Sequence, residues 1–425
     1  MTRVAVSLLV TLLLTHAALA GVGDPPPRVG EIIVEGNTRT SRAVVDRVMQ
    51  VRPGDPLSLD DFDAVWDRLE DCGYFAFVDL DTEEQDDGTV TLHVMLEEEK
   101  TSRISPYARY DRRHKYLLGV GLSETNFGGR GETVDAQFVF TRITRGLARW
   151  TKPWLFGADG LQLSLEAQGE QGGFVYRPFD YTQWHVTAAV RQYVAGPFYL
   201  EAGGGLEGFE QKDDYTWDEG GGAALHPATD RTNWLVRGLL GVDTRDNPFY
   251  PTGGFYTALG VEYRDGADQP DVATGQGQAA MDLDIRAFVP LPGPPVLALR
   301  GYTRIYDSVT GTPEHTLRWG GPETVRGATY AGREGDRAYL ATAELRWPLF
   351  MMPVAITGEQ VGLGVHAFTD VGDAFFDDRV IHNPRALFSW GGGAHLNLLT
   401  WQLRFEAARE RDGEWVFEFM DVFNF

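Results

Sequence analysis

The segment that decides the fold class is Met281–Ala287, which reads MDLDIRA. Apolar and polar side chains alternate along it, and successive side chains of a β-strand point to opposite faces of a sheet. One face is therefore apolar, while the other carries two aspartates and an arginine. The same alternation recurs in Val361–Ala367 and in Trp401–Glu406. The pattern predicts a sheet with one polar face, which fits either a soluble sandwich or a transmembrane barrel.

The connections between these segments favour the barrel. Alternating segments follow one another from about residue 101 onward, and about sixteen strands can be marked, an even number as in bacterial outer-membrane barrels. The connections alternate between short ones, such as Ala195-Gly196, and long ones, such as Asp307–Asp336. Short turns on one side and long loops on the other are typical of an outer-membrane barrel. We therefore predict a mainly β protein, with a 16-stranded transmembrane antiparallel β-barrel over residues 101–425.

The amino-terminal residues 1–20 have the features of a secretory signal peptide. The positive charge of Arg3 precedes an apolar run, Val4–Leu14, and Ala18-Leu19-Ala20 supplies small residues for cleavage. The run is shorter than the about 20 apolar residues that a transmembrane helix needs. A short proline-containing spacer is expected over residues 21–28.

Residues 29–100 predict a small α+β domain with the order β-α-α-β-β. The expected elements are a strand over Gly30–Asn37, a helix over Arg42–Gln50, a helix after Ser58, and strands over Tyr74–Leu80 and Thr89–Leu96. Ser41 and Ser58 are the expected helix N-caps. The three strands would leave open sheet edges, and such an edge can accept a strand from another chain.

The composition argues against several functions. Lys and Arg number 38 against 61 Asp and Glu, which gives a net charge of −23. Because so acidic a chain repels phosphates, nucleic acid is not an expected partner. The single cysteine, Cys72, excludes an internal disulfide. The sequence has no nucleophile-elbow, zinc-protease or phosphate-loop motif. We therefore expect no enzyme activity, no catalytic residue, no cofactor and no metal site.

The long connection Asp307–Asp336 contains the tripeptide Val325-Arg326-Gly327. Trp319 and Tyr330 give it anchors that a disordered polar tract lacks. Arg326 has five donors and cannot lose its charge, so a loop folded inward needs a carboxylate partner for it. From the residues alone, Arg326 is either such a buried charge or a solvated charge on an outer loop.

Four barrel segments, taken in chain order, carry a family resemblance. They are Thr125–Gly131, Asp243–Gly254, Gly320–Gly327 and Phe368–Gly372. The domain before them, with its Leu69–Phe75 run, resembles a POTRA (polypeptide-transport-associated) domain. Together these segments resemble the BamA/TamA superfamily of outer-membrane insertases and translocases, of the bacterial surface antigen type. The resemblance covers nearly the whole mature chain.

The resemblance implies a latch inside the barrel. In that family the Val-Arg-Gly loop returns into the lumen, and its arginine pairs with carboxylates on the inner wall. The matching residues here are Val325, Arg326 and Gly327 in the loop, with Glu344 and Asp370 as the carboxylates. Strand alternation independently places the lumen side chains as Glu344, Arg346, His366, Phe368 and Asp370. Two departures stand out: Ala328 replaces an aromatic residue common in the family, and there is one POTRA-like domain where relatives often carry several.

The resemblance also implies a function in the outer membrane, with the POTRA-like domain in the periplasm. The implied partners are unfolded outer-membrane or secreted polypeptide clients, the lipid bilayer and periplasmic accessory proteins. A client strand captured by the POTRA-like domain would pass to a seam between the first and last barrel strands. Pro106 in the first strand, which donates no ladder hydrogen bond, and Phe425 at the end of the last strand mark this seam. A porin-like channel and a lipid-transport barrel remain alternatives at this point.

Overall fold

The computed structural model describes residues 26–111, 115–174, 177–218, 223–248, 250–266, 277–307, 316–330, 332–353, 360–376, 385–399 and 401–420. The chain divides into two compact units, Met1–Glu99 and Lys100–Phe425. The predicted signal peptide, most of the predicted spacer and Phe425 lie outside the described residues. The α+β unit and the β unit have separate clusters of buried apolar side chains.

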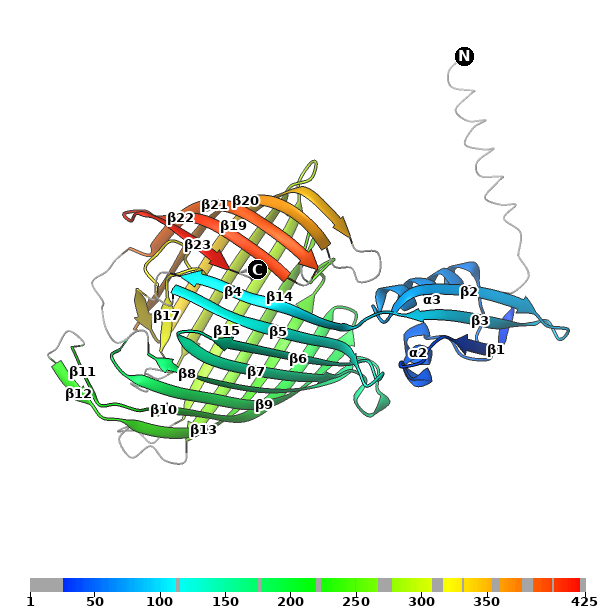
Figure 1. The fold of residues 1–425 in the computed structure, drawn as a ribbon, viewed down its shortest axis with the longest axis horizontal. Helices are drawn as coiled ribbons and strands as arrows, with labels where there is room; N and C mark the ends of the chain where they lie inside the picture. Colours follow the sequence, from blue (N-terminus) through cyan, green and yellow to red (C-terminus); the bar gives the residue numbers. More distant parts are fainter. Residues whose placement is uncertain are drawn as a thin grey trace, which may run out of the picture. The chain divides into compact units, whose positions relative to one another are not determined.

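The amino-terminal unit has the predicted order β-α-α-β-β (Figure 1). Its elements are β1 (Arg28–Glu35), α2 (Arg42–Met49), α3 (Leu59–Asp71), β2 (Phe75–Glu84) and β3 (Thr89–Glu98). The sheet order is β1-β3-β2, with β1 parallel to β3 and β2 antiparallel to it. Both β1 and β2 are therefore edge strands of this sheet.

Apolar side chains of the two helices and the sheet form the core of this unit. Leu69 of α3 and Met49 of α2 are buried together with Phe75 and Leu92 of the sheet. Helix α3 begins with a capping box, in which the Ser58 hydroxyl accepts from the N–H of Asp61. The prediction for Ser41 was wrong in one respect. Within the described residues its side chain makes no capping hydrogen bond, and its carbonyl instead accepts from the N–H groups of Val44 and Val45.

Glu98 at the end of β3 fixes the turn between β1 and α2. Its carboxylate accepts hydrogen bonds from the Thr38 hydroxyl at 2.6 Å, from the Arg39 N–H at 2.9 Å and from the Thr40 N–H. Partial burial opposes the charge, but these hydrogen bonds outweigh it and hold the pKa of Glu98 below its ordinary value. The ionised form therefore stabilises the turn.

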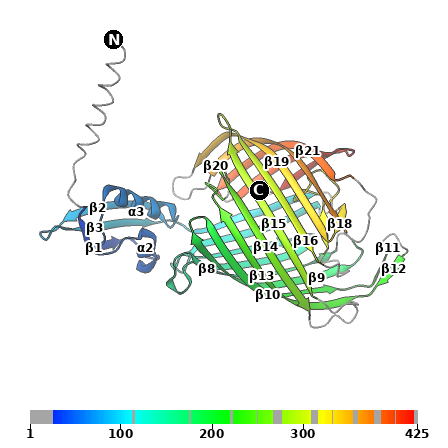
Figure 2. The same cartoon turned by 180° about the vertical axis from the view of Figure 1, so that it is seen from behind.

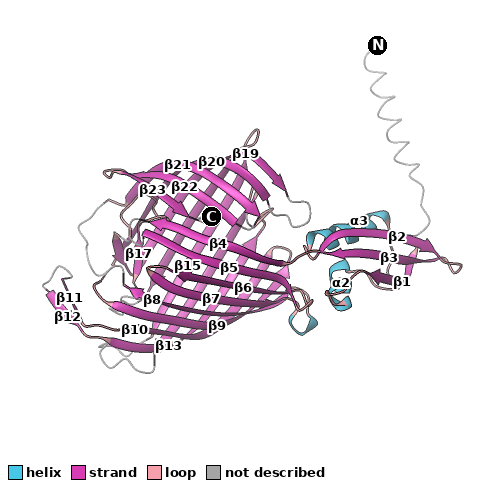
Figure 3. Cartoon of the chain, viewed as in Figure 1, coloured by secondary structure: helices cyan, strands magenta, loops and turns pink. Residues whose placement is uncertain are grey.

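The Lys100–Phe425 unit is a closed antiparallel barrel of sixteen strands in its described part. In chain order these are β4 (Ser102–Asp111), β5 (Lys115–Phe127), β6 (Glu132–Phe140), β7 (Ile143–Lys152), β8 (Leu161–Gly173), β9 (Asp180–Ala195), β10 (Phe198–Gln211), β13 (Thr229–Asp243), β14 (Gly254–Gly266), β15 (Gln278–Pro290), β16 (Val296–Tyr306), β19 (Arg337–Pro353), β20 (Gln360–Phe375), β21 (Leu387–Leu399), β22 (Trp401–Glu410) and β23 (Trp415–Met420). Figure 2 shows β13 to β16 continuing into β19 and β20 along one wall. Both α-helices of the described chain lie in the amino-terminal unit (Figure 3).

The alternation read from the sequence separates the two faces of the barrel wall. In β15, Met281 is 47% exposed on the outside, whereas Asp282 is 5% exposed on the lumen side. The outer face is apolar in the same way on other strands, for example at Leu240 of β13 and Val365 of β20. An apolar exterior around a charged interior is the arrangement of a transmembrane barrel. No helix among the described residues is long and apolar enough to cross a bilayer.

Three short elements lie between barrel strands. The hairpin of β11 (Tyr215–Asp218) and β12 (Ala223–His226) extends the connection from β10 to β13, and a 3-10 turn, Leu155–Gly157, lies between β7 and β8. The connection from β16 to β19 contains a small antiparallel pair, β17 (Leu317–Trp319) and β18 (Arg333–Gly335). We refer to residues 316–336 as the lumen loop.

We predict that Glu98→Gln speeds amide hydrogen exchange at Arg39 and Thr40 of the full chain above pH 5, because the neutral amide accepts the hydrogen bonds of these two N–H groups more weakly. Since the pKa of Glu98 is depressed, wild type and variant should converge as the pH falls through that pKa and the carboxylate is protonated. Mass spectrometry of deuterium uptake measures both effects. Glu97→Gln, one residue earlier on the strand, is the matched control. Equal exchange in all three proteins at pH 7 contradicts the role of Glu98.

Candidate functional site

The Val325-Arg326-Gly327 turn of the lumen loop is buried inside the barrel. The N–H of Gly321 donates to the Val325 carbonyl at 3.1 Å, and the N–H of Ala328 donates to the same carbonyl at 3.2 Å. Trp319 of the loop stacks on Tyr302 of β16, with ring centroids 6.0 Å apart. These local contacts shape the loop so that the Arg326 side chain extends toward the inner wall.

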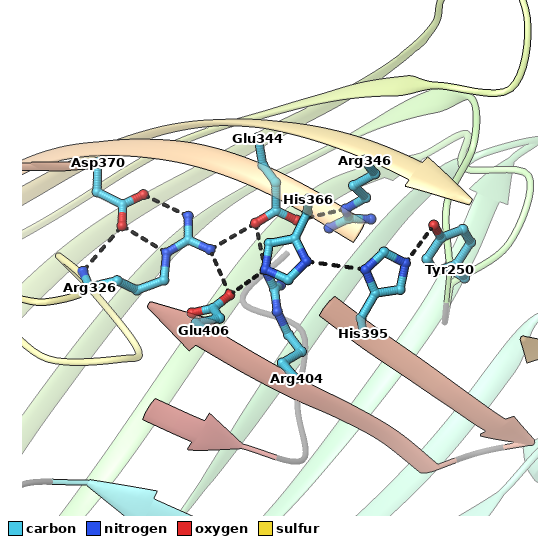
Figure 4. A network of polar contacts seen from close by, with 9 residues as sticks. All are labelled: Tyr250, Arg326, Glu344, Arg346, His366, Asp370, His395, Arg404 and Glu406. Carbon is cyan, nitrogen blue, oxygen red and sulfur yellow. Dashed lines mark hydrogen bonds and ion pairs between the residues drawn. The ribbon is translucent and has the colours of Figure 1, made fainter. Parts of the chain in front are cut away.

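Arg326 binds carboxylates from three different strands (Figure 4). Its Nε lies 2.8 Å from Oδ2 of Asp370 on β20, and its Nη2 lies 2.8 Å from Oδ1 of the same carboxylate, so the pair is bidentate. Its Nη1 lies 2.7 Å from Glu344 on β19 and 3.2 Å from Glu406 on β22. All four side chains are at most 1% exposed. Removing one partner of such a buried pair leaves a charge uncompensated, which costs about 3–5 kcal/mol.

Two further arginines balance the charge of this cluster. Arg346 Nε lies 2.9 Å from Glu344, while Arg404 Nη2 lies 2.6 Å from both Glu344 and Glu406. Three guanidinium groups therefore meet three carboxylates, and their formal charges sum to zero. A balanced, densely hydrogen-bonded cluster is the condition under which buried charges are tolerated. The guanidinium carbon of Arg326 also lies 3.4 Å from the ring centroid of Phe368, a cation–π contact.

The cluster contains one set of groups with the spacing of metal ligands. Glu344, His366 and Glu406 each offer a ligand atom, all within 4.8 Å of one another. A His-and-carboxylate set suits zinc in principle. Here, however, Arg326 and Arg404 already bind both carboxylates, and a divalent cation would displace these guanidinium groups and unbalance the cluster. The donor set therefore does not fit a resident metal ion.

A chain of hydrogen bonds extends from the cluster to Tyr250, in the connection between β13 and β14. Glu406 Oε1 lies 2.9 Å from His366 Nε2, His366 Nδ1 lies 3.1 Å from His395 Nδ1, and His395 Nε2 lies 3.0 Å from the Tyr250 hydroxyl. A carboxylate only accepts, so with neutral imidazoles His366 donates from Nε2 and accepts at Nδ1. His395 must then donate from Nδ1 and accept from the tyrosine. The geometry thereby fixes the direction of every hydrogen bond from Tyr250 to Glu406.

Gly327 is required by the close approach of the loop to β22. Its φ is +76°, and a Cβ at this position would lie 2.8 Å from the carbonyl carbon and Cβ of Ala408. Any larger residue would combine left-handed backbone strain with overlap against the wall. The absence of a side chain at Gly327 thus allows the loop to lie directly against β22.

The structure brings together five of the predicted residues: Val325, Arg326, Gly327, Glu344 and Asp370. Pro106 lies in β4, a strand that carries none of these five residues. The sequence reasoning missed Glu406, Arg404 and the His395–Tyr250 pair as parts of the cluster. A signal for the first two existed, since alternation in Trp401–Glu406 places both on the lumen side. The depth to which the loop reaches is not readable from that signal.

The fold and cluster define a class: a transmembrane β-barrel whose lumen holds a loop pinned by a buried arginine, preceded by a small β-α-α-β-β domain. A family model described as the Omp85 superfamily domain matches residues 126–419, and a POTRA model, described as surface antigen variable number repeat, matches residues 27–99. The chain therefore belongs to the Omp85 superfamily and carries one POTRA domain in its described part.

Individual relatives agree with this family. The chain is 26% identical over 256 residues to the outer membrane protein assembly factor BamA of Neisseria meningitidis serogroup B (strain ATCC BAA-335 / MC58). The match covers 55% of this chain and 31% of that protein, so it spans about a third of the relative's length. Among solved structures, BamA from Haemophilus ducreyi lacking POTRA domains 1–3 matches with a TM-score of 0.68 and 15% identity, over 93% of this chain and 85% of that one. CdiB from Acinetobacter baumannii matches with a TM-score of 0.60 and 14% identity, over 93% and 73% of the two chains. Both share the fold.

We predict that Asp370→Asn lowers the free energy needed to open the lumen loop by about 3–5 kcal/mol, because it leaves the buried Arg326 without its bidentate carboxylate partner. Deuterium uptake of the peptide covering residues 316–330 should rise accordingly. Asp373→Asn is the matched control, since Asp373 lies on the same strand and also binds the loop. Its Oδ1 lies 3.3 Å from Arg333 Nε, and this ion pair is less buried than the Arg326–Asp370 pair. Its effect should stay near 1 kcal/mol or below. Equal uptake in the two variants contradicts a dominant role of the Arg326–Asp370 pair.

The hydrogen-bond chain predicts the tautomer of His395. In the wild type its proton resides on Nδ1, and Tyr250→Phe should disturb this preference because Nε2 loses its donor. Nitrogen chemical shifts of ¹⁵N-histidine in the reconstituted protein report the tautomer. Tyr199→Phe removes another barrel tyrosine hydroxyl, bonded to Tyr256, and should leave His395 unchanged. A wild-type His395 protonated on Nε2 contradicts the assigned direction.

Proposed function

We propose that this protein inserts polypeptides into, or translocates them across, a bacterial outer membrane, with its POTRA domain in the periplasm. The observation that carries the proposal is the union of a POTRA domain with an Omp85 barrel whose lumen contains a loop pinned by Arg326. A POTRA domain offers edge strands for an extended client, and the curated relative is an assembly factor. The client would be an unfolded outer-membrane or secreted polypeptide, and periplasmic accessory proteins would dock on the POTRA domain.

The route for the client is the seam between β23 and β4. In the described residues these strands meet where Phe419 of β23 pairs with Tyr110 of β4. The backbone of a strand edge can accept another strand when the seam opens. Pro106 of β4 supplies no N–H for pairing, which helps keep this edge open to exchange. Client folding and burial in lipid would provide the free energy.

Capture in the periplasm would use the β2 edge of the POTRA sheet. Next to this edge, Phe77 of β2 and Trp66 of α3 are exposed, and the Trp66 indole donates to the Val78 carbonyl at 3.1 Å. Apolar side chains beside an open edge suit an extended peptide, because the edge supplies backbone hydrogen bonds and the aromatic rings supply side-chain contacts.

The pinned loop favours this function over a porin. A porin conducts through an open lumen, whereas here the loop occupies the lumen and is held by several buried ion pairs. A steady porin-like conductance of the purified protein in planar bilayers contradicts the proposal. No feature of the described residues specifically favours lipid transport.

We predict that a photo-reactive amino acid at Ala108 of β4 or at Phe77 of β2 cross-links nascent outer-membrane or secreted polypeptides in living cells. Leu240 on the lipid-facing side of β13 is the control position, because β13 lies on the part of the wall away from β4 and β23. Its yield of client should be at background. Equal client capture at Leu240, or capture of none at all three positions, contradicts the proposed route.

A further inference from the structure

The lumen loop contacts the first barrel strand as well as the wall that holds Arg326. Glu323 of the loop lies 2.5 Å from Arg109 Nη1 on β4. The Arg109 side chain is 11% exposed and the Glu323 side chain 66%. Arg109 is one residue from Tyr110, the residue of β4 that pairs with β23. The ion pair therefore connects the loop to β4, one residue from the position at which Tyr110 pairs with Phe419 of β23.

The same loop also contacts β22, the strand next to β23. Gly327 packs against Ala408 of β22, the strand that pairs with β23. Going around the wall from β22 to β4 means crossing two strand spacings, about 10 Å. The four-residue step from Glu323 to Gly327 reaches at most about 14 Å when extended. The loop is thus long enough to span the seam and contacts a strand on each side of it.

We propose that the lumen loop is an inner clasp of the seam, in which Glu323 retains β4 while Gly327 packs against β22, the neighbour of β23. This inference rests on the proposed function, because it makes the loop the part that must yield when a client enters the seam. The clasp acts through side chains, and a client strand that pairs with the backbone of β4 does not replace them. The Arg326 cluster anchors the clasp to the wall.

Other ion pairs of the loop lie away from the seam. Glu334 of β18 binds Arg177, in the connection between β8 and β9, at 2.9 Å, and Arg318 of β17 at 3.3 Å. Glu334 is thus an acidic residue of the same loop that is also bonded to arginines, and neither of these ion pairs involves β4 or β23. It provides a control that removes the same charge without touching the clasp.

The test measures seam closure without any client. In the full chain carrying Cys72→Ser, Tyr110→Cys and Phe419→Cys place two thiols on paired residues of β4 and β23, close enough for a disulfide. We expect Glu323→Gln to slow oxidative cross-linking of this pair about two- to fivefold, the range that a partly exposed ion pair produces. Glu334→Gln should leave the rate unchanged. Heat-modifiable migration in electrophoresis verifies that each barrel is folded.

A charge exchange tests the pair itself. Arg109→Glu alone should slow the cross-link, and Arg109→Glu combined with Glu323→Arg should restore it at least in part. Two results would overturn the clasp. In the first, the Glu323→Gln variant forms the cross-link as fast as the parent protein. In the second, Glu323→Gln and Glu334→Gln slow the cross-link equally. Because no client is present, these outcomes are independent of the photo-cross-linking result. A seam that depends on Glu323 in a protein that captures no client leaves the clasp intact and removes the proposed function instead.

Discussion

The interaction on which the lumen architecture depends is the burial of one guanidinium group that cannot lose its charge. Because Arg326 stays protonated, a loop that carries it into the barrel must find carboxylates there. Asp370, Glu344 and Glu406 come from β20, β19 and β22, so the wall has to be in register before the loop can seat. The position of the loop and the register of this part of the barrel therefore specify each other.

Charge balance and hydrogen bonding extend this constraint across the lumen. Arg346 and Arg404 neutralise the remaining carboxylate charge, and the two histidines connect Glu406 to Tyr250 in the connection between β13 and β14. A substitution at Glu406 or at Tyr250 therefore changes the hydrogen bonding of the two histidines between them. The same loop contacts β4 through Glu323 and β22 through Gly327, which places the Arg326 cluster, the opposite wall and the first strand in one connected structure.

Local patterns predicted much of the fold, because alternation and turn spacing depend on neighbours in sequence. The MDLDIRA segment indicated the two faces of β15, and the order of the POTRA elements followed from helix and strand periodicity. Glu344 and Asp370 came from the family resemblance together with strand alternation. Alternation placed Glu406 on the lumen side, but its contact with Arg326 and the contact of Tyr250 with His395 could not be predicted, since they join residues 80 and 145 positions apart. Those contacts depend on the closure of the barrel and on the depth of the loop, which no local pattern encodes.

The most direct test of the account is a double-mutant cycle on Arg326 and Asp370. The unfolding free energy of the reconstituted barrel is measured for the wild type, Arg326→Ala, Asp370→Ala and the double variant. If the buried guanidinium pins the loop to the wall, the two substitutions are strongly non-additive, with a coupling of about 1–3 kcal/mol. Additivity within about 0.5 kcal/mol means that the two side chains do not interact in the folded barrel, and it would contradict the account.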